Sequence, residues 1–506
     1  MKISTALAFV STLVATLTLT PEIVVAEAYG DAFRIGDFSN GYQAPYSAVA
    51  GANGDVAILW ASDGAHFISR YDGAGRPLQS RPLAVEADVY EVAVSGTGSF
   101  ATVRFVSNGI GSDLFIKVYD RSGNQVVAEF MVNAPTADQR VHYGAKIAMN
   151  SRGQFAVVWQ RWSASGSGSL ATEVFARRYE ANGVPVAPAA LVRTASARVL
   201  GNDIGIDSRG NFVVIWNEVV GSGVSADLYG RRYAYYGAPI APAFLINLGE
   251  TQMPHIAMNS AGAFVVATYS RSSALKWNVQ ARRFSASAVA LGLPVNVNVQ
   301  QSDAPMCLDL DTSSDGGFVV TWQEATGSTT GPILARSFDV NGGAIDAPTK
   351  VSADNGGTRE FGCPVLAVDP AGNSTIAWEQ RESPVSPDAW DAFARRYTPA
   401  NASVTPLVSG QTMTGLAGAP GSWSYFKIRV EPGQATLDVI MSGTIGDADL
   451  YLRRGALPTL TQWDGRPYLN GSNEGVRMLN FPPGDWYIGV NGYTSFSSVS
   501  LNARAY

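Results

Sequence analysis

Three glutamates have the residue type and the position to do chemistry, because each closely follows a tryptophan that ends a recurring apolar stretch. They are Glu218, Glu324 and Glu379. Paired carboxylates beside a sugar-binding channel hydrolyse glycosidic bonds, one acting as the acid and the other as base or nucleophile. These glutamates are therefore the catalytic candidates if the protein is a carbohydrate-active enzyme.

The sequence contains neither a zinc-peptidase motif of the His-Glu-x-x-His type nor a serine-hydrolase elbow. The chain holds only three histidines, His66, His142 and His255, and none of them belongs to a His-Glu-x-x-His zinc motif. No Gly-x-Ser-x-Gly elbow follows an expected strand and precedes a helix, as a serine hydrolase of that class requires. The pattern therefore predicts neither a zinc peptidase nor a serine peptidase, and no cofactor is expected for the main part of the chain.

A second set of residues suits ligand binding, because it combines tryptophans with mixed charge at positions where the repeated copies differ. Such surfaces are typical of sites for a carbohydrate or a protein ligand. The alternative for each residue is an ordinary solvated loop. The candidates are Arg161, Trp162, His142, His255, Lys276, Trp277, Arg381 and Trp390.

The elements that must position these residues are seven copies of one pattern. Each copy has a glycine turn, an apolar run ending in an aromatic residue and a basic-aromatic strand, as in the stretch from Asp207 to Tyr233. Successive aromatic residues are 45, 54, 57, 53, 53 and 56 positions apart. A period of this size indicates a repeat array. The aromatic residues are Trp60, Phe105, Trp159, Trp216, Tyr269, Trp322 and Trp378.

Each copy resolves into four short strands, so the fold class is all-β. Glycine at the last turn position, as at Gly153 and Gly210, supplies the positive φ of a tight hairpin. The second strand is apolar throughout, which favours burial on both of its faces. Four antiparallel strands in roughly 50 residues form a propeller blade. The sequence therefore predicts a seven-bladed β-propeller over residues 31–403.

The segment that closes the predicted ring lies ahead of the first copy. Residues Ala32 to Gly36 match the fourth strands of other copies, whereas the last copy lacks such a strand after Tyr397. We expect this N-terminal strand to complete the last blade, because an unpaired edge would otherwise remain. The alternative fourth strand is Val404 to Val408.

Propeller geometry also predicts which face carries the candidate site. The loops between second and third strands open on the same face as the links between blades, and the candidate residues fall there. Paired arginines such as Arg177-Arg178 and Arg282-Arg283 recur in most copies, so we interpret them as part of blade packing. Their stems are expected to cover apolar surface while the guanidinium groups pair with turn carboxylates.

The C-terminal residues 405–506 follow a different pattern. They contain the stretch from Gly446 to Leu452, the stretch from Pro483 to Tyr493, and a last strand from Val499 to Ala503. These motifs resemble the bacterial pre-peptidase C-terminal (PPC) domain. The resemblance implies a small, jelly-roll-like β-sandwich found on secreted bacterial enzymes, and it is similar to collagen-binding domains, some of which hold calcium.

Asp447 and Asp449 are the calcium candidates of this domain, because calcium takes several oxygen ligands. The alternative is that both carboxylates accept hydrogen bonds from a turn.

The first 26 residues have the composition of a secretory signal peptide. Lys2 precedes an apolar stretch from Ala6 to Leu19, and small residues suit cleavage after Ala26. No later run is long enough to span a membrane. The formal net charge of −6 and the absence of a basic cluster argue against nucleic-acid binding. A secreted, extracellular protein is expected.

The two cysteines, Cys307 and Cys363, each lie 15 residues before the aromatic residue of their copy. Equal registers in neighbouring copies and an oxidising compartment predict a disulfide between the last two blades.

The sequence therefore predicts a secreted protein that binds a carbohydrate or a protein without catalysis. The alternative is a carbohydrate-active enzyme that uses the loop-face glutamates. A third possibility is a structural component of a secreted complex.

Overall fold

The computed structural model describes residues 22–24, 32–36, 41–73, 75–109, 111–133, 141–164, 170–195, 198–219, 226–247, 249–272, 276–304, 306–326, 329–345, 347–352, 360–381, 390–397, 402–454, 457–458, 460, 463–467, 469–480 and 482–506. In these ranges every regular element is a strand, and the protein is all-β. No helix in them is long and apolar enough to cross a membrane.

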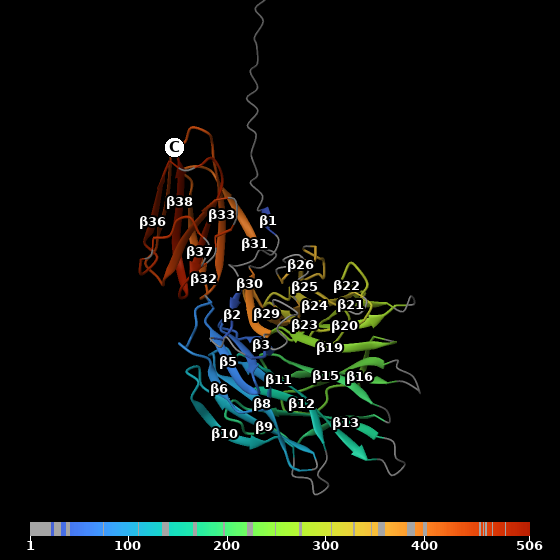
Figure 1. Cartoon of the computed structure of the whole chain (residues 1–506). Helices are drawn as coiled ribbons and strands as arrows, with labels where there is room; N and C mark the ends of the chain where they lie inside the picture. Colours follow the sequence, from blue (N-terminus) through green and yellow to red (C-terminus); the bar gives the residue numbers. More distant parts are fainter. Residues whose placement is uncertain are drawn as a thin grey trace, which may run out of the picture.

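Seven sheets follow one another in chain order around a ring, as the colours in Figure 1 show. We number these blades 1 to 7. The first strands are β3 (Gln43–Ala50), β7 (Val89–Val94), β11 (His142–Met149), β15 (Val199–Ile206), β19 (Thr251–Met258), β23 (Leu308–Thr312) and β28 (Val365–Val368). The second strands are β4 (Val56–Ser62), β8 (Phe100–Ser107), β12 (Phe155–Ala164), β16 (Phe212–Val219), β20 (Phe264–Arg271), β24 (Phe318–Thr326) and β29 (Ser374–Arg381).

The third and fourth strands complete each blade toward the rim. The third strands are β5 (Ala65–Tyr71), β9 (Ser112–Tyr119), β13 (Leu170–Tyr179), β17 (Ala226–Tyr233), β21 (Trp277–Phe284), β25 (Thr329–Phe338) and β30 (Trp390–Tyr397). The fourth strands are β6 (Leu83–Val85), β10 (Gln125–Met131), β14 (Ala190–Ala195), β18 (Phe244–Asn247), β22 (Val295–Asn296), β26 (Thr349–Lys350) and, for blade 7, β2 (Phe33–Arg34). A short strand, β27 (Glu360–Phe361), also pairs with β29.

The core lies between neighbouring blades. Every residue of β4 is buried, which agrees with its apolar composition. Between blades 3 and 4, Val158 and Val174 pack in one cluster with Ile204 and Trp216. The recurring aromatic residues are buried except Phe105, which is half-buried at the loop face. The hairpin glycines adopt the predicted positive φ, for example +79° at Gly153.

The paired arginines bind main-chain carbonyls of neighbouring blades. The first arginine of a pair binds the preceding blade, since the Arg177 Nη1 donates to the Val132 oxygen at 3.3 Å. The second arginine binds the following blade, since the Arg178 Nη1 donates to the Tyr235 oxygen at 2.8 Å. Structural use of these arginines is therefore supported. Arg178 also has an expected turn carboxylate as partner, since it binds Glu180 at 3.1 Å, while the contacts between blades are to backbone oxygens.

Blade 7 contains both ends of the propeller chain. Phe33 and Arg34 of β2 pair antiparallel with Ala394 and Phe393 of β30, and the Ile35 nitrogen donates to the Ala392 oxygen at 3.0 Å. Blue β2 lies beside orange β30 in Figure 1. The N-terminal segment thus supplies the outer strand of the last blade.

The predicted disulfide is confirmed. Cys307 and Cys363 are bonded, with their Cα atoms 5.2 Å apart, and both border the first strands of blades 6 and 7. The bridge therefore joins two neighbouring blades close to the centre of the ring.

The C-terminal domain is a sandwich of two sheets. One has the order β1-β31-β33-β37-β35 and the other β32-β38-β34-β36. Apolar side chains from both sheets form one core cluster, which includes Trp486 and Leu501. The bounds are β1 (Glu22–Val24), β31 (Ala402–Leu407), β32 (Thr412–Gly418), β33 (Trp423–Val430), β34 (Thr436–Ser442), β35 (Ala448–Arg454), β36 (Glu474–Leu479), β37 (Gly484–Gly492) and β38 (Phe496–Ala505).

Two features of the sandwich differ from the sequence expectation. Strand β31 begins at Ala402, slightly before the expected boundary at residue 405, and belongs to the sandwich. Strand β1 pairs with β31, although it falls inside the predicted signal peptide. The rest of that peptide lies outside the described residues.

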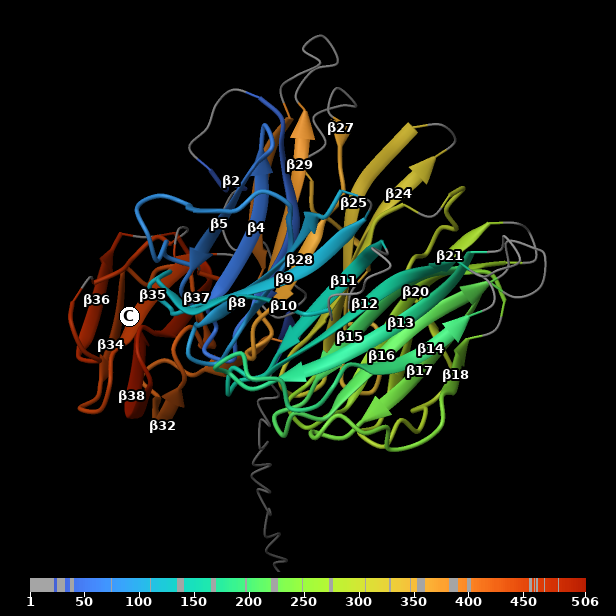
Figure 2. The same ribbon diagram turned by 90° about the horizontal axis from the view of Figure 1, so that it is seen from below.

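The sandwich packs against blade 1, beside the ring in Figure 2. The Arg76 guanidinium carbon lies 3.9 Å from the centroid of the Tyr493 ring. Gly421 approaches Gly73 so closely that a Cβ at position 421 would lie 2.6 Å from the Gly73 oxygen. Close backbone approach therefore requires glycine at this contact.

Candidate functional site

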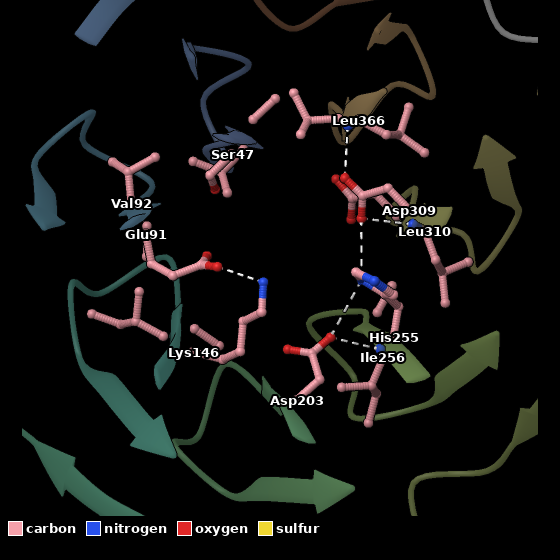
Figure 3. A pocket seen from close by; sticks show the side chains of 18 of the residues that line it. Ser47, Glu91, Val92, Lys146, Asp203, His255, Ile256, Asp309, Leu310 and Leu366 are labelled. Atoms are coloured by element: carbon pink, nitrogen blue, oxygen red, sulfur yellow. Dashed lines mark hydrogen bonds and ion pairs between the residues drawn. The ribbon is translucent and has the colours of Figure 1, made fainter. Parts of the chain in front are cut away.

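The first strands place one side chain from each blade at one level of the central channel, which has a volume of about 430 Å³. Each of these residues pairs with a second-strand position one or two residues before the recurring aromatic residue. They are Ser47, Glu91, Lys146, Asp203, His255, Asp309 and Val365. Figure 3 shows the polar members facing one another across the channel.

An irregularity in strand pairing precedes five of these residues, whereas Asp309 and Val365 line the channel without one. The register shifts between Tyr143 and Lys146 in blade 3, for example, and between Gln252 and His255 in blade 5. An extra residue on one strand bends it and redirects the following side chains. The channel lining therefore arises from local strand geometry as well as from residue type.

Two groups of ionisable side chains lie on facing sides of the channel. Lys146 forms an ion pair with Glu91 on one side. On the other side, His255 Nδ1 lies 3.4 Å from an Asp309 oxygen and 3.9 Å from an Asp203 oxygen, as drawn in Figure 3. Burial opposes the charge of Lys146, but the attraction of Glu91 and Asp203 outweighs it and raises the pKa of the ammonium.

The channel aspartates hold neighbouring blades together. Asp203 accepts a hydrogen bond from the Ile256 nitrogen at 2.9 Å, and Asp309 accepts one from the Leu366 nitrogen at 2.8 Å. Each bond joins a first strand to the first strand of the next blade, where edge N–H groups would otherwise lack partners. Burial raises the pKa of Asp203, although His255 and Lys146 oppose the shift. The two channel aspartates thus serve mainly to join the strands that form the channel wall.

The mouth of the channel on the loop face carries a row of aromatic side chains from blades 7, 1 and 2. We call Trp390, Tyr42, Tyr46 and Tyr90 the mouth row. Tyr42, Tyr46 and Tyr90 are 44%, 41% and 42% exposed. The Tyr42 and Trp390 ring centroids are 6.4 Å apart, and those of Tyr46 and Tyr90 are 6.3 Å apart. The row therefore presents exposed rings beside a polar channel.

A carboxyl group and an imidazole accompany the mouth row. The Tyr42 hydroxyl donates to Glu379 at 2.5 Å, and burial raises the pKa of Glu379 although this hydrogen bond opposes the shift. A side chain at Gly362 would overlap Glu379, so this glycine makes room for the carboxylate. The His66 ring stacks on Tyr46 with centroids 5.7 Å apart, and burial lowers the pKa of His66.

Three predicted site residues are instead bound to partners of opposite charge. Glu218 is buried, and both of its oxygens accept hydrogen bonds from Arg193 at 2.8 Å. Arg161 binds Glu173 at 2.7 Å. Lys276 forms an ion pair with Asp303. Arg161 and Glu173 belong to one blade, whereas Arg193 of blade 3 binds Glu218 of blade 4.

Three further candidates do not lie on the exposed loop face as expected. Trp277 is only 5% exposed, because it packs in the core between blades 5 and 6. His142 is buried at the start of β11, where its Nε2 lies 3.4 Å from the Asn133 amide nitrogen. His255 belongs to the channel. The expectation of exposed loop positions is wrong for these three, because the first and third strands begin earlier than predicted.

The remaining candidates stay near the loop face. Trp162 is 40% exposed and packs edge-on against Tyr143, with ring centroids 5.1 Å apart. The Arg381 guanidinium lies over the Trp390 ring at 5.2 Å. Glu324 is partly buried in blade 6, and burial raises the pKa of its carboxyl group. The structure therefore brings together Glu379, Arg381 and Trp390, but not the other two glutamates.

The calcium candidates of the sandwich accept hydrogen bonds from the protein. Asp449 binds Arg466 at 3.0 Å and the Tyr451 hydroxyl at 3.2 Å. Asp447 accepts a bond from the Gly471 nitrogen at 3.0 Å. Among the described residues, no group of three or more His, Cys, Asp or Glu side chains could hold a metal ion. The Asp447 contact agrees with the turn interpretation, whereas the partners of Asp449 are side chains. Calcium binding stays a prediction.

Sequence reasoning missed the polar channel ring and the tyrosines of the mouth row. An ionisable residue inside the apolar first strands of blades 2 to 6, such as Glu91 or Lys146, is the signal that marks the ring. Tyr42, Tyr46 and Tyr90 had no such signal, because their common location depends on ring closure and on contacts between blades.

Comparison with known proteins relates the C-terminal domain to secreted proteases. Residues 424–492 match the model of the bacterial pre-peptidase C-terminal domain. The chain is 44% identical over 98 residues to alkaline serine exoprotease A of Vibrio alginolyticus, a match that covers 19% of this chain and 18% of that protein. It is 40% identical over 97 residues to an extracellular protease of Xanthomonas campestris, covering 19% and 17% of the two chains. The chain thus spans less than a fifth of the length of either relative.

Among solved structures, the fold is similar to that of an ulvan lyase described as a new family of polysaccharide lyase. The two chains are 10% identical, the TM-score is 0.44, and the match covers 74% of this chain and 95% of that one. In the C-terminal part, sequence motifs, the two-sheet sandwich and the family match agree. Residues 424–492 therefore belong to the bacterial pre-peptidase C-terminal domain family.

Proposed function

We propose that the protein is exported and binds an extended carbohydrate chain along the mouth row. The observation that carries this proposal is the series of rings from the half-buried Trp390 through the exposed Tyr42 and Tyr46 to Tyr90. Aromatic rings offer flat apolar surface at little entropic cost, and the C–H faces of sugar rings pack on such surface. A series across three blades matches successive sugars of one chain.

Polar groups beside the row supply partners for sugar hydroxyl groups. Glu379 accepts a hydrogen bond from Tyr42 and retains acceptor capacity, since a carboxylate offers about four lone-pair directions. The His66 imidazole lies beside the row, because its ring stacks on Tyr46. Rings for stacking and a few placed polar groups are the usual composition of a small-molecule site.

Export is supported by the predicted signal peptide, the disulfide and the pre-peptidase C-terminal domain. Disulfides persist in oxidising compartments outside the cytosol. Peptide sequencing of protein recovered from culture medium tests this part, with a new N-terminus after Ala26 as the expected result.

Binding is tested with the full exported protein on an array of neutral and acidic polysaccharides. We expect Trp390→Ala and Tyr46→Ala each to weaken binding about fivefold, the effect of losing roughly 1 kcal/mol of ring contact. Trp463→Ala is the matched control, because Trp463 is 41% exposed but lies on the sandwich. Unchanged affinity in both mouth-row variants would contradict the proposal.

A second candidate function, carbohydrate cleavage, is favoured by Glu379 alone among the three glutamates. Its carboxyl group has a raised pKa, as a general acid requires, and it adjoins the mouth row. The test is whether the wild-type protein releases new sugar ends. Release that is lost in Glu379→Gln but kept in Glu218→Gln and Glu324→Gln would show catalysis, and the binding proposal would then be given up. No release by the wild-type protein is expected if the protein only binds.

A further inference from the structure

A second hollow lies on the opposite face of the propeller, between the turns of blades 3 and 4. It has a volume of about 550 Å³, within the usual range of ligand pockets, roughly 300–1,000 Å³. Arg152, Arg209 and the buried Arg178 line it together with Glu180. Three guanidinium groups against one carboxylate leave two net positive charges, because arginine stays protonated in proteins.

The two outer arginines are free to bind a ligand. Arg152 and Arg209 are exposed, and neither guanidinium has a hydrogen-bond or ion-pair partner in the described ranges. Several other surface arginines of the propeller differ in this respect, since Arg104 binds Glu129 at 2.6 Å and Arg193 binds Glu218 at 2.8 Å. Two adjacent unpaired guanidinium groups repel each other and favour an anion between them.

The floor of the hollow is fixed by hydrogen bonds between the blades. Arg178 Nη1 donates to Glu180 at 3.1 Å and to the Tyr235 oxygen at 2.8 Å. Gln154 donates to the second oxygen of Glu180 at 2.7 Å, and the Tyr235 nitrogen donates to Asn211 at 3.1 Å. A floor of this kind loses little entropy when a ligand binds.

Aromatic surface borders the positive charge. Tyr235 and Tyr236 are 55% and 56% exposed, and their rings pack edge to face with centroids 5.2 Å apart. Arginine occupies the third turn position only in blades 3 and 4, and the corresponding turns of the other blades carry Asn53, Thr97, Ala261, Asp315 and Ala371. The hollow is therefore a local specialisation of two blades rather than a feature of blade packing.

We propose that this hollow binds an acidic saccharide, with its anionic group between Arg152 and Arg209 and a sugar ring against Tyr235. Charge alone would suit any anion, but exposed rings beside the guanidinium groups favour a sugar acid over an acidic peptide. The anionic group is a carboxylate or a sulfate ester, since planar guanidinium groups bind both through paired hydrogen bonds. The site is independent of the mouth row, which lies on the other face.

Calorimetry of the full protein tests the proposal with oligogalacturonate, a dextran sulfate oligomer, neutral dextran and polyglutamate of similar length. The expected result is salt-sensitive binding of one or both acidic saccharides, weakened about tenfold or more in the double variant Arg152→Gln/Arg209→Gln and in Tyr235→Ala. Binding of oligogalacturonate alone assigns a carboxylate ligand, and binding of dextran sulfate alone assigns a sulfate ligand.

The control is Arg81→Gln, which removes an exposed arginine of blade 1 and should leave affinity unchanged. Thermal melting of each variant verifies folding, because none of the substituted side chains belongs to the core. Equal binding of polyglutamate would overturn the saccharide assignment. Equal binding of acidic saccharides by the wild type and the double variant, or binding of neither acidic saccharide by the wild type, would overturn the site.

Discussion

Asp311 connects the charge of a single residue to the stability of the ring. Its two oxygens accept hydrogen bonds from the Thr312 and Val368 nitrogens at 2.7 Å, so it joins the first strands of blades 6 and 7. Burial raises its pKa to about 7, although these bonds oppose the shift. Because the folded-state pKa is raised, the protonated form stabilises the fold at low pH.

We therefore expect the contribution of Asp311 to be complete below about pH 4 and to be lost as the pH rises toward 7. The loss is up to about 4 kcal/mol, from roughly three pKa units at 1.36 kcal/mol each. Calorimetric melting of the wild type and Asp311→Asn between pH 4 and 8 measures it as the difference between the two curves. Burial also raises the pKa of Glu474 in the sandwich to about 7, but this group is common to both proteins and cancels. The prediction would be contradicted if the melting temperatures of the two proteins differed by the same amount at every pH.

At the residue scale, the sequence predicted what every copy repeats. Trp159 and Trp216 could be assigned to the core because they recur with a fixed period. Trp277 could not, since only Trp390 of blade 7 occupies the same position in another copy, and the burial of Trp277 depends on packing against the next blade. Repetition separates structural residues from others, but it does not reveal which unique residues are exposed.

Among the elements, the disulfide stabilises the contact between blades 6 and 7. Cys307 and Cys363 close a loop with a sequence separation of 56 residues. A loop of this length predicts a stabilisation of about 4 kcal/mol through the lost entropy of the unfolded chain. The double variant Cys307→Ser/Cys363→Ser should therefore melt several degrees lower by calorimetry, and a reducing agent should lower the wild-type melting temperature but not that of the variant. An unchanged melting temperature after reduction would contradict this account.

Strand β2 provides the second prediction at this scale. Deleting residues 31–38 removes the fourth strand of blade 7 and leaves the backbone edge of β30 unpaired. The deletion also removes Ile35, which packs with Trp60 in the core. We expect a large fall in melting temperature and aggregation, measured by calorimetry and light scattering.

The matched control is Arg34→Ala, which removes the ion pair with Asp391 but keeps the backbone pairing. It should cost about 1 kcal/mol or less, because Arg34 is largely exposed. A monomeric deletion variant with unchanged melting would contradict closure by β2.

For the whole molecule, the sandwich contacts the propeller at blade 1. Arg76 lies over the Tyr493 ring, and Gly421 lies against Gly73. The double variant Arg76→Ala/Tyr493→Ala should loosen the sandwich, raising the radius of gyration in X-ray scattering while both domains keep their melting transitions. Tyr506→Ala, at an exposed end of the sandwich, is the control. An unchanged radius would show that other contacts hold the two domains.

The sequence predicted the order of the two domains but not their contact or the hollow between blades 3 and 4. Period and turn chemistry depend on neighbours in the chain, so the blades could be derived from the repeat. The mouth row and the hollow each combine residues from two or more blades, such as Tyr90 with Trp390 or Arg152 with Tyr235. Their composition becomes visible only when the blades have defined neighbours.

Closure by β2 also constrains the order of events during synthesis. Arg34 and its partner Asp391 are 357 positions apart, so an early segment of the chain has no partner until almost the whole propeller has been made. Blades 1 to 6 each contain four consecutive strands and can form in turn, whereas blade 7 must recruit a segment made long before. If the chain is exported N-terminus first, as the proposed secretion implies, β2 crosses the membrane long before its partner β30. Pairing of β2 with β30 is then the last step of folding, and it takes place outside the cell.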